Sequence, residues 1–172
     1  MRVVTLTVAL VFGTSCVAAA RTQSKASTKS AVGVEIGTMG VSGTDESLFQ
    51  LGLRVRPQQG GYGSVDFSFA TFPDALSSDA FLFLMDLGIT YGAPKDSSPV
   101  YVFPHGGASL LACAGLSNGS CGGAVAGYNV GAGLLVRASP KLGIGFDYTY
   151  RRTLSLGGVG AHSMTFGLMF LH

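Results

Sequence analysis

The chain has 172 residues, which is enough for one domain, and its formal net charge of +2 is too small to indicate a nucleic acid or another acidic partner. Only 12% of the residues are charged, whereas about 25% are charged in ordinary soluble proteins. The mean hydropathy is +0.43, yet no apolar run of about 18 residues follows the N-terminal segment, so we expect the apolar residues in strands and not in transmembrane helices.

Residues 1–20 predict a cleaved signal peptide. Arg2 precedes an apolar run that ends in three consecutive Ala residues, a typical cleavage site, and we expect cleavage after Ala20. The alternatives are a retained membrane anchor and lipidation at Cys16; lipidation is disfavoured because no branched residue stands three positions before this Cys. Residues 21–30 are polar and basic, which predicts a short flexible lead-in.

The remaining chain alternates apolar and polar residues with a period of two, which is the signature of β-strands. Several of the alternating segments have about ten residues, which matches the roughly 9–11 needed to cross a bilayer at a tilt. We therefore expect an all-β fold over residues 31–172, an eight-stranded antiparallel up-and-down transmembrane β-barrel. The expected strands are 31–41, 47–56, 62–72, 80–92, 100–112, two within 126–153, and 162–172.

The strand 142–151 shows which face of the sheet meets which surroundings. One face carries Leu, Ile, Phe and two Tyr residues, and the other carries two Gly residues with Asp147, Thr149 and Arg151. A face of small and polar residues suits a crowded barrel interior, and a continuous bulky apolar face suits lipid. A soluble ligand-binding barrel is the alternative, and it would need the reverse arrangement, with the bulky apolar residues inside.

The expected inward face carries acids and bases in equal number. Because an eight-stranded barrel has little free space inside, these charges are predicted to pair and to fill the interior. A narrow channel for ions or very small solutes is the alternative, although the interior lacks an excess of one sign. The predicted interior network consists of Glu35, Arg54, Arg56, Asp66, Asp86, Arg137, Asp147 and Arg151.

The hairpin within 126–153 can be placed in register by parity. Arg137 and Asp147 both lie on the inward face, and residues directly opposite in an antiparallel pair share a face, so the loop must hold an odd number of residues. The simplest loop has three residues and pairs Ala138 with Leu142. It sets Gly133 opposite Asp147 and Asn129 opposite Arg151, and each Gly is expected to leave space for a long charged side chain.

The strand 100–112 departs from the pattern. Pro104 cannot donate to a ladder, and His105 falls on the side of Tyr101 and Phe103, so we expect a β-bulge there. Aromatic residues near the strand ends predict two interfacial girdles, formed by Tyr62, Tyr91 and Tyr101 at one rim and by Phe72, Phe81 and Tyr150 at the other.

Few residues suggest chemistry. Cys113 and Cys121 flank a short Asn-Gly turn, and a disulfide is expected in an oxidising compartment, whereas their spacing has no partner for a metal site. His162 and Ser163 are adjacent and face opposite sides of a strand, which disfavours a nucleophile–base pair. We therefore predict no enzyme activity, no cofactor and no catalytic or metal-binding residue.

The segment "YNVGAGLLVRASPKLGIGFDYTYR" followed by "MTFGLMF" resembles the closing three strands of small outer-membrane barrels of the OmpA/OmpX-like and opacity-porin type. The resemblance implies a bacterial outer-membrane location, a monomer surrounded by membrane lipid, and a structural or surface-interaction role with an unspecified ligand. In that family, the barrel-assembly machinery reads an aromatic residue that ends the last strand, and Phe170 takes that position here. With eight strands, both ends of the barrel chain would lie on the periplasmic side.

Overall fold

The computed structural model describes residues 29–58, 63–78, 80–91, 99–115, 122–155 and 158–171. The predicted signal peptide, Tyr62 and Cys121 lie outside the described residues. No helix in the described part of the chain is long and apolar enough to cross a membrane.

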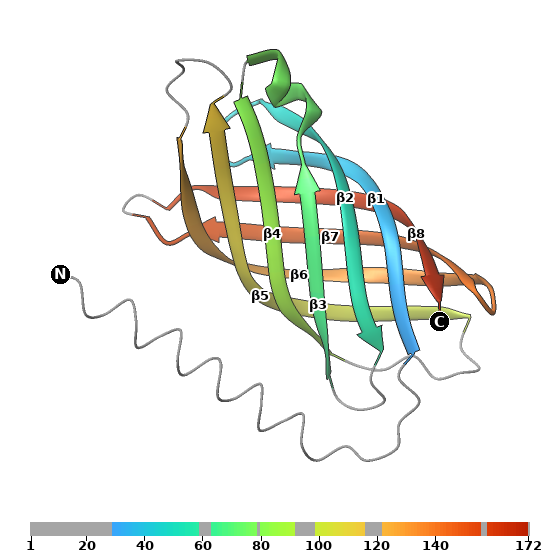
Figure 1. Ribbon diagram of the computed structural model, residues 1–172. Helices are drawn as coiled ribbons and strands as arrows, with labels where there is room; N and C mark the ends of the chain where they lie inside the picture. The colour runs from blue at the N-terminus through green and yellow to red at the C-terminus, as the bar shows by residue number, and fades with distance from the viewer. Residues whose placement is uncertain are drawn as a thin grey trace.

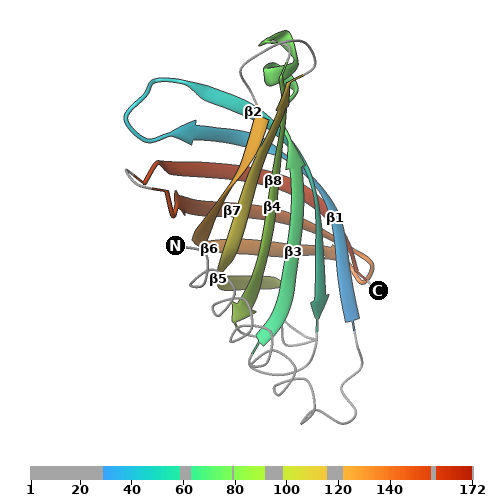
Figure 2. The same cartoon turned by 60° about the vertical axis from the view of Figure 1, so that its left-hand side comes forward.

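Eight antiparallel strands follow one another around a closed barrel, in which β8 returns to pair with β1 (Figure 1). The predicted eight-stranded up-and-down barrel is therefore confirmed. A 3₁₀ helix, η1 (Pro73–Ser78), joins β3 to β4 and stands at the upper end of these strands in Figures 1 and 2. The strands are β1 (Lys29–Val41), β2 (Ser47–Gln58), β3 (Gly63–Thr71), β4 (Ala80–Tyr91), β5 (Val100–Gly115), β6 (Gly122–Ser139), β7 (Leu142–Thr153) and β8 (Gly160–Leu171).

The strands turn their large apolar residues outward. On β8, for example, Ser163 and Thr165 are buried inside the barrel, whereas the side chains of Phe166 and Leu168 are about half exposed on its outer surface. The same alternation on the other strands leaves an outer surface of Val, Leu, Ile, Met and Phe side chains. A soluble protein rarely exposes apolar patches of this extent, whereas a lipid-facing barrel must.

The β6–β7 hairpin has the predicted register with one correction. Gly133 lies opposite Asp147 and Asn129 opposite Arg151, as predicted. The predicted pairing of Ala138 with Leu142 is wrong, because Leu142 pairs with Ser139 and the register shifts between Arg137 and Ser139. The turn therefore has two residues, and one bulged residue on β6 restores the odd count that the shared inward face requires.

The bulge predicted at Pro104 is absent from the described pairing. The β5–β6 register runs without a shift from Val100 opposite Val136 to Ala114 opposite Gly122. The β4–β5 pairing ends at Thr90 opposite His105, one residue short of Pro104, so that ladder needs no donor from the proline. With β5 unbroken, Phe103 and His105 both point into the barrel and are buried.

Two apolar clusters fill the ends of the barrel interior, which the sequence did not predict. The lower apolar cluster lies where β1 begins and β8 ends, and Tyr101 packs against it. The upper apolar cluster lies beneath η1 at the opposite end. The lower cluster comprises Ala31, Phe103, Leu135, Met169 and Leu171, and the upper comprises Met39, Ala70, Phe72, Ala75 and Leu84.

Phe72 illustrates why the predicted outer girdle is only partly correct. The sequence placed Phe72 at the lipid-facing rim, but its side chain is fully buried in the upper apolar cluster. The chain leaves β3 at Thr71 and turns inward over the barrel mouth, where Ala75 of η1 is also buried. A hydrogen bond from the Phe49 N–H to Asp74 Oδ2, at 2.7 Å, ties this turn to β2.

Inward glycines give room to neighbouring side chains, which are apolar as well as charged. A Cβ on Gly133 would overlap the Phe103 ring and would lie 2.7 Å from Asp147 Oδ2. A Cβ on Gly143 would lie 2.8 Å from Leu135 Cδ1. The expectation that Gly makes space for charged groups holds at Gly133, while Gly143 serves the lower apolar cluster.

Gly133→Ala should destabilise the barrel by about 1–3 kcal/mol, because the added methyl group must displace both a buried ring and a buried carboxylate. The matched control is Gly40→Ala on β1, where the nearest atom lies 3.9 Å from the new Cβ, and the expected change is within about 0.5 kcal/mol. Urea unfolding of the two variants in lipid vesicles measures both values. Equal effects would contradict the packing described here.

Candidate functional site

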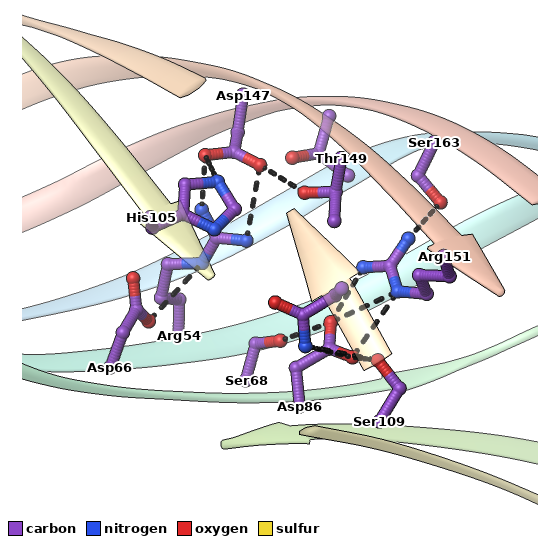
Figure 3. A network of polar contacts seen from close by, with 12 residues as sticks. Arg54, Asp66, Ser68, Asp86, His105, Ser109, Asp147, Thr149, Arg151 and Ser163 are labelled. Atoms are coloured by element: carbon purple, nitrogen blue, oxygen red, sulfur yellow. Dashed lines mark hydrogen bonds and ion pairs between the residues drawn. The ribbon is translucent and has the colours of Figure 1, made fainter. Parts of the chain in front are cut away.

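A network of buried charges lies inside the barrel, and Figure 3 shows a large part of it. Seven of the eight charged residues predicted inside the barrel are buried, and they come from β1, β2, β3, β4 and β7. Arg137 is the exception, since it is half-buried near the turn between β6 and β7. The buried seven are Glu35, Arg54, Arg56, Asp66, Asp86, Asp147 and Arg151.

Arg54 on β2 joins three carboxylates from three other strands. Its Nη1 atom lies 2.8 Å from Asp147 Oδ2 on β7, and its Nε atom lies 3.2 Å from Glu35 Oε1 on β1. Asp66 Oδ1 on β3 lies 3.7 Å from the same Nε atom. The guanidinium therefore links β2 to both of its neighbours and, across the interior, to β7.

His105 is a member of the network that the sequence analysis missed. Its Nε2 atom lies 3.0 Å from Asp147 Oδ2, an ion pair when the imidazole is protonated. Gly131 on β6 makes space for the ring, because a Cβ there would lie 2.7 Å from His105 Nε2. Asp147 also accepts a hydrogen bond from Thr149 Oγ1 at 2.6 Å. The carboxylate thus has partners on β2, β5 and its own strand.

His105 also bears on the charge balance of the interior. The described interior buries four carboxylates but only three guanidinium groups, because Arg137 lies at the rim. His105 lies beside Asp147 and supplies a fourth positive charge only when its imidazole is protonated. The sequence offered one signal, because His105 and Ser109 are four residues apart on one strand and therefore share a face. The structure shows that both side chains are buried.

Asp86 and Arg151 form a second group, nearer η1. The Arg151 Nη2 atom lies 2.6 Å from Asp86 Oδ2, and its Nε atom lies 3.2 Å from Oδ1, so the pair is bidentate. Arg151 Nη1 donates to Ser163 Oγ at 2.6 Å. Ser68, Ser109 and Asn129 donate to the Asp86 carboxylate, which therefore gathers contacts from β3, β5 and β6.

Arg56 and Asp66 form a third group, which touches the lower apolar cluster. The Arg56 Nη2 atom lies 2.6 Å from Asp66 Oδ2, and Thr90 Oγ1 donates to the same oxygen at 3.1 Å. The guanidinium carbon of Arg56 stands 3.7 Å from the centroid of the Phe103 ring, a cation–π contact. The polar network and the apolar cluster are therefore packed as one body.

The space between these groups is very small. A cavity of about 10 Å³ lies among them, which is room for about one water molecule. Its walls are formed by Arg54, Asp66, Ser68, Asp86, Gly88, His105 and Asn129. A network with one water-sized space can fix strands in register, but it offers no room for a substrate.

The residues considered for other chemistry do not come together in one site. The Ser163 hydroxyl accepts from Arg151 inside the barrel, whereas His162 is exposed outside and its Nδ1 atom lies 2.5 Å from Tyr148 Oη. Among the described residues, no group of three or more His, Cys, Asp or Glu side chains could hold a metal ion. Cys113 lies two residues before the end of β5. Its predicted disulfide with Cys121 stays a prediction, because Cys121 is outside the described residues.

Phe170, the predicted assembly signal, lies on the outward face of β8. Its side chain is half exposed and pairs across the strands with Val32 of β1 and Leu142 of β7. Leu171, the next residue, turns inward into the lower apolar cluster.

Comparison with known proteins identifies the fold. No protein-family model and no curated protein matches the sequence. Among solved structures, the N-terminal barrel domain of Pseudomonas aeruginosa OprF matches with a TM-score of 0.64 and 14% identity, over 83% of this chain and 97% of that chain. The chain has the fold of the small outer-membrane β-barrels.

Two further structures support the same conclusion. Neisserial surface protein A matches with a TM-score of 0.63 and 15% identity, over 83% of this chain and 95% of that chain. Ail, the attachment invasion locus protein of Yersinia pestis, matches with a TM-score of 0.54 and 17% identity, over 86% of this chain and the whole of that chain. The resemblance predicted from the last three strands is thus confirmed for the fold, which is that of the small outer-membrane barrels.

Asp147→Leu should destabilise the barrel by about 3 kcal/mol or more, because it removes the closest carboxylate from Arg54 and leaves a buried charge undercompensated. Phe146→Leu, one residue away on the outward face, should cost about 1 kcal/mol or less, since an apolar group of similar size remains. Unfolding in lipid vesicles compares the two variants. The reverse order of stability would show that the faces of β7 are wrongly assigned.

A double-mutant cycle separates the ion pair from the general effect of substitution. Arg54→Met combined with Asp147→Leu should cost less than the sum of the two single changes, by about 0.5–3 kcal/mol. Arg54→Met combined with Phe146→Leu should be additive within about 0.5 kcal/mol, because Phe146 does not touch the network.

Proposed function

We propose that this chain is an integral protein of the bacterial outer membrane with a structural or surface-interaction role and a closed, charge-paired interior. The observation that carries the proposal is the alternation on single strands. On β7, the side chains of Asp147 and Arg151 are buried inside the barrel, whereas the side chain of Phe146, the residue before Asp147, is exposed on the outer surface. Only apolar surroundings make such an outer surface stable, and lipid provides them.

The order of apolar and charged layers along the barrel supports a closed interior. An ion crossing the barrel would pass the upper apolar cluster, the paired charges and the lower apolar cluster in turn. The two clusters offer no polar groups to replace the hydration shell of an ion, and the paired charges are mutually compensated. A narrow channel for ions or very small solutes is the alternative that these layers disfavour.

The proposed orientation of the barrel in the membrane follows from its even number of strands. Both ends of the described barrel would lie on the periplasmic side, and η1 with the loops at its end would lie at the cell surface. Lipid would cover the outward face of a monomer, and the barrel-assembly machinery would read Phe170 during biogenesis. The names of two similar barrels, a surface protein and an attachment invasion locus protein, agree with a role at the cell surface. A catalytic role is not proposed, because the buried carboxylates are engaged by bases and hydroxyl groups.

Location is tested by fractionation of cells that express the full chain. The protein should remain in the outer-membrane pellet after a carbonate wash, and the detergent-solubilised protein should migrate differently on gels before and after heating. Recovery in the soluble periplasmic fraction would overturn the membrane assignment and would favour a soluble barrel.

Conductance is tested with the purified protein in planar lipid bilayers. No steady single-channel steps are expected, because apolar clusters close the interior at both ends. A purified general porin in the same bilayers serves as the positive control. Reproducible channels of this protein would contradict the closed interior and would support the channel alternative.

A further inference from the structure

We propose that the barrel wall opens locally between β2 and β3 at its lower end, the end that holds the lower apolar cluster, and that the Arg56–Asp66 ion pair keeps this opening closed. Three observations carry the inference: a short ladder, a proline that explains it, and a buried ion pair where the ladder ends. The inference goes beyond the proposed function, because it concerns a motion of the wall and not the location or role of the protein.

The ladder between β2 and β3 is the shortest of the eight in the described part of the chain. It joins residues 51–55 of β2 to residues 67–71 of β3. Below this point both strands continue and keep their other neighbours, since β2 pairs with β1 as far as Gln58 and β3 pairs with β4 from Gly63 onward. In Figures 1 and 2 the two strands diverge towards this end.

Pro57 explains why the ladder ends. The Phe49 N–H donates to Asp74 of η1, which follows β3, so this N–H points to the β3 side of β2. Every second residue of a strand directs its N–H and C=O the same way, so Val55 and Pro57 also face β3. Val55 is the last residue that pairs, because Pro57 has no N–H to donate to Val65, the next partner in the register. This cause lies in the residue itself and does not depend on the loop that follows.

A buried ion pair stands where the next ladder pair would be. The register places Arg56 opposite Asp66, and Nε and Nη2 of the Arg lie 3.0 and 2.6 Å from Asp66 Oδ2. Thr90 on β4 donates to the same carboxylate, and the Phe103 ring lies against the guanidinium. The lower part of this seam is therefore joined by side chains, each of which has a second partner away from the seam.

The rest of the barrel confines the opening to this end. The members of the lower apolar cluster lie on β1, β5, β6 and β8, so the cluster does not bridge β2 and β3. At the upper end, the hydrogen bond from Phe49 to Asp74 and the burial of Phe72 and Ala75 close the same seam. An opening at the lower end would bring water to the Arg56–Asp66 pair, but the upper apolar cluster would stay in place and no channel would form.

The opening costs less here than on a fully paired seam. Separating paired strands in lipid leaves backbone N–H and C=O groups without partners, and Pro57 has already removed one such bond from this seam. Arg56 stands two residues from the end of β2 and Asp66 three residues from the start of β3, within about 10 Å of the strand ends. Water at the membrane surface can therefore hydrate both charges when they separate.

Amide hydrogen exchange, measured by NMR on the whole barrel in lipid nanodiscs, tests the opening in the wild-type protein. The Phe67 N–H faces β2 in the last pair of the ladder, whereas the Ser68 N–H faces β4, so neighbouring residues report on two different seams. A paired amide exchanges only when its hydrogen bond opens. The protection factor of Phe67 should be about tenfold or more below that of Ser68. Equal protection of the two amides would overturn the proposal.

Pro57→Val tests the cause, because it supplies the missing N–H at a position that already faces Val65. The protection factor of Phe67 should rise about tenfold, since the ladder can continue past it. The matched control is Pro104→Val on β5, where the β4–β5 pairing ends one residue before the proline, and Phe67 should be unaffected. An unchanged Phe67 in the Pro57→Val variant would show that the proline does not set the opening and would overturn the proposal.

Arg56→Met tests the ion pair. The protection factor of Phe67 should fall by a further factor of about ten, whereas Arg56→Lys, which keeps the positive charge, should lower it less. Protection of Phe67 that is the same in the Arg56→Met variant and the wild type would contradict the role of the pair. If Arg56→Met does not fold, Pro57→Val decides the question, because it adds a hydrogen bond and removes no contact of the charge network. These results leave membrane location and conductance untouched, so failure of this inference is distinguishable from failure of the proposed function.

Discussion

The interior of this barrel depends on one buried guanidinium. Arg54 draws carboxylates from β1, β3 and β7 to within ion-pair distance, so strands on opposite sides of the barrel are fixed relative to one another. Burying a charge is costly, and the cost is offset only while every partner stays in place. A slip of any of these strands by one residue would turn its acid outward. The network therefore specifies register as much as it stabilises the fold.

The apolar residues divide into three sets that together isolate this network from water. The largest set covers the outer surface, and the other two close the interior at its ends. Inward glycines allow the arrangement, because a barrel of eight strands cannot hold a bulky residue at every inward position. Phe103 shows the connection most clearly: its ring fills the space left by Gly133 and also lies against the Arg56 guanidinium.

Alternation and parity made most of the fold predictable, and their limits explain the errors. Charged residues mark the inward face of β7, so its faces and its pairing with β6 followed from the sequence, except at the turn, where Leu142 pairs with Ser139 and not with Ala138. β5 carries no acid and no Arg or Lys, and Pro104 suggested a break, so the inward orientation of Phe103 and His105 was missed. The burial of Phe72 depends on how η1 folds over the barrel mouth, which a two-residue period cannot show. The ion-pair partners across the interior could not be predicted either, because they depend on how the barrel closes.

The central claim is that the apolar face meets lipid while the charges face inward. The chain contains no Trp, so a single introduced Trp is an unambiguous fluorescent reporter. Leu53→Trp, Leu87→Trp, Val130→Trp and Leu168→Trp place the reporter on the outward face of four strands, and Asp45→Trp in the β1–β2 turn is the control. In vesicles of phospholipids with brominated acyl chains, the four outward reporters should be strongly quenched and the control should not. Outward reporters that are quenched by aqueous acrylamide and not by brominated chains would contradict the account.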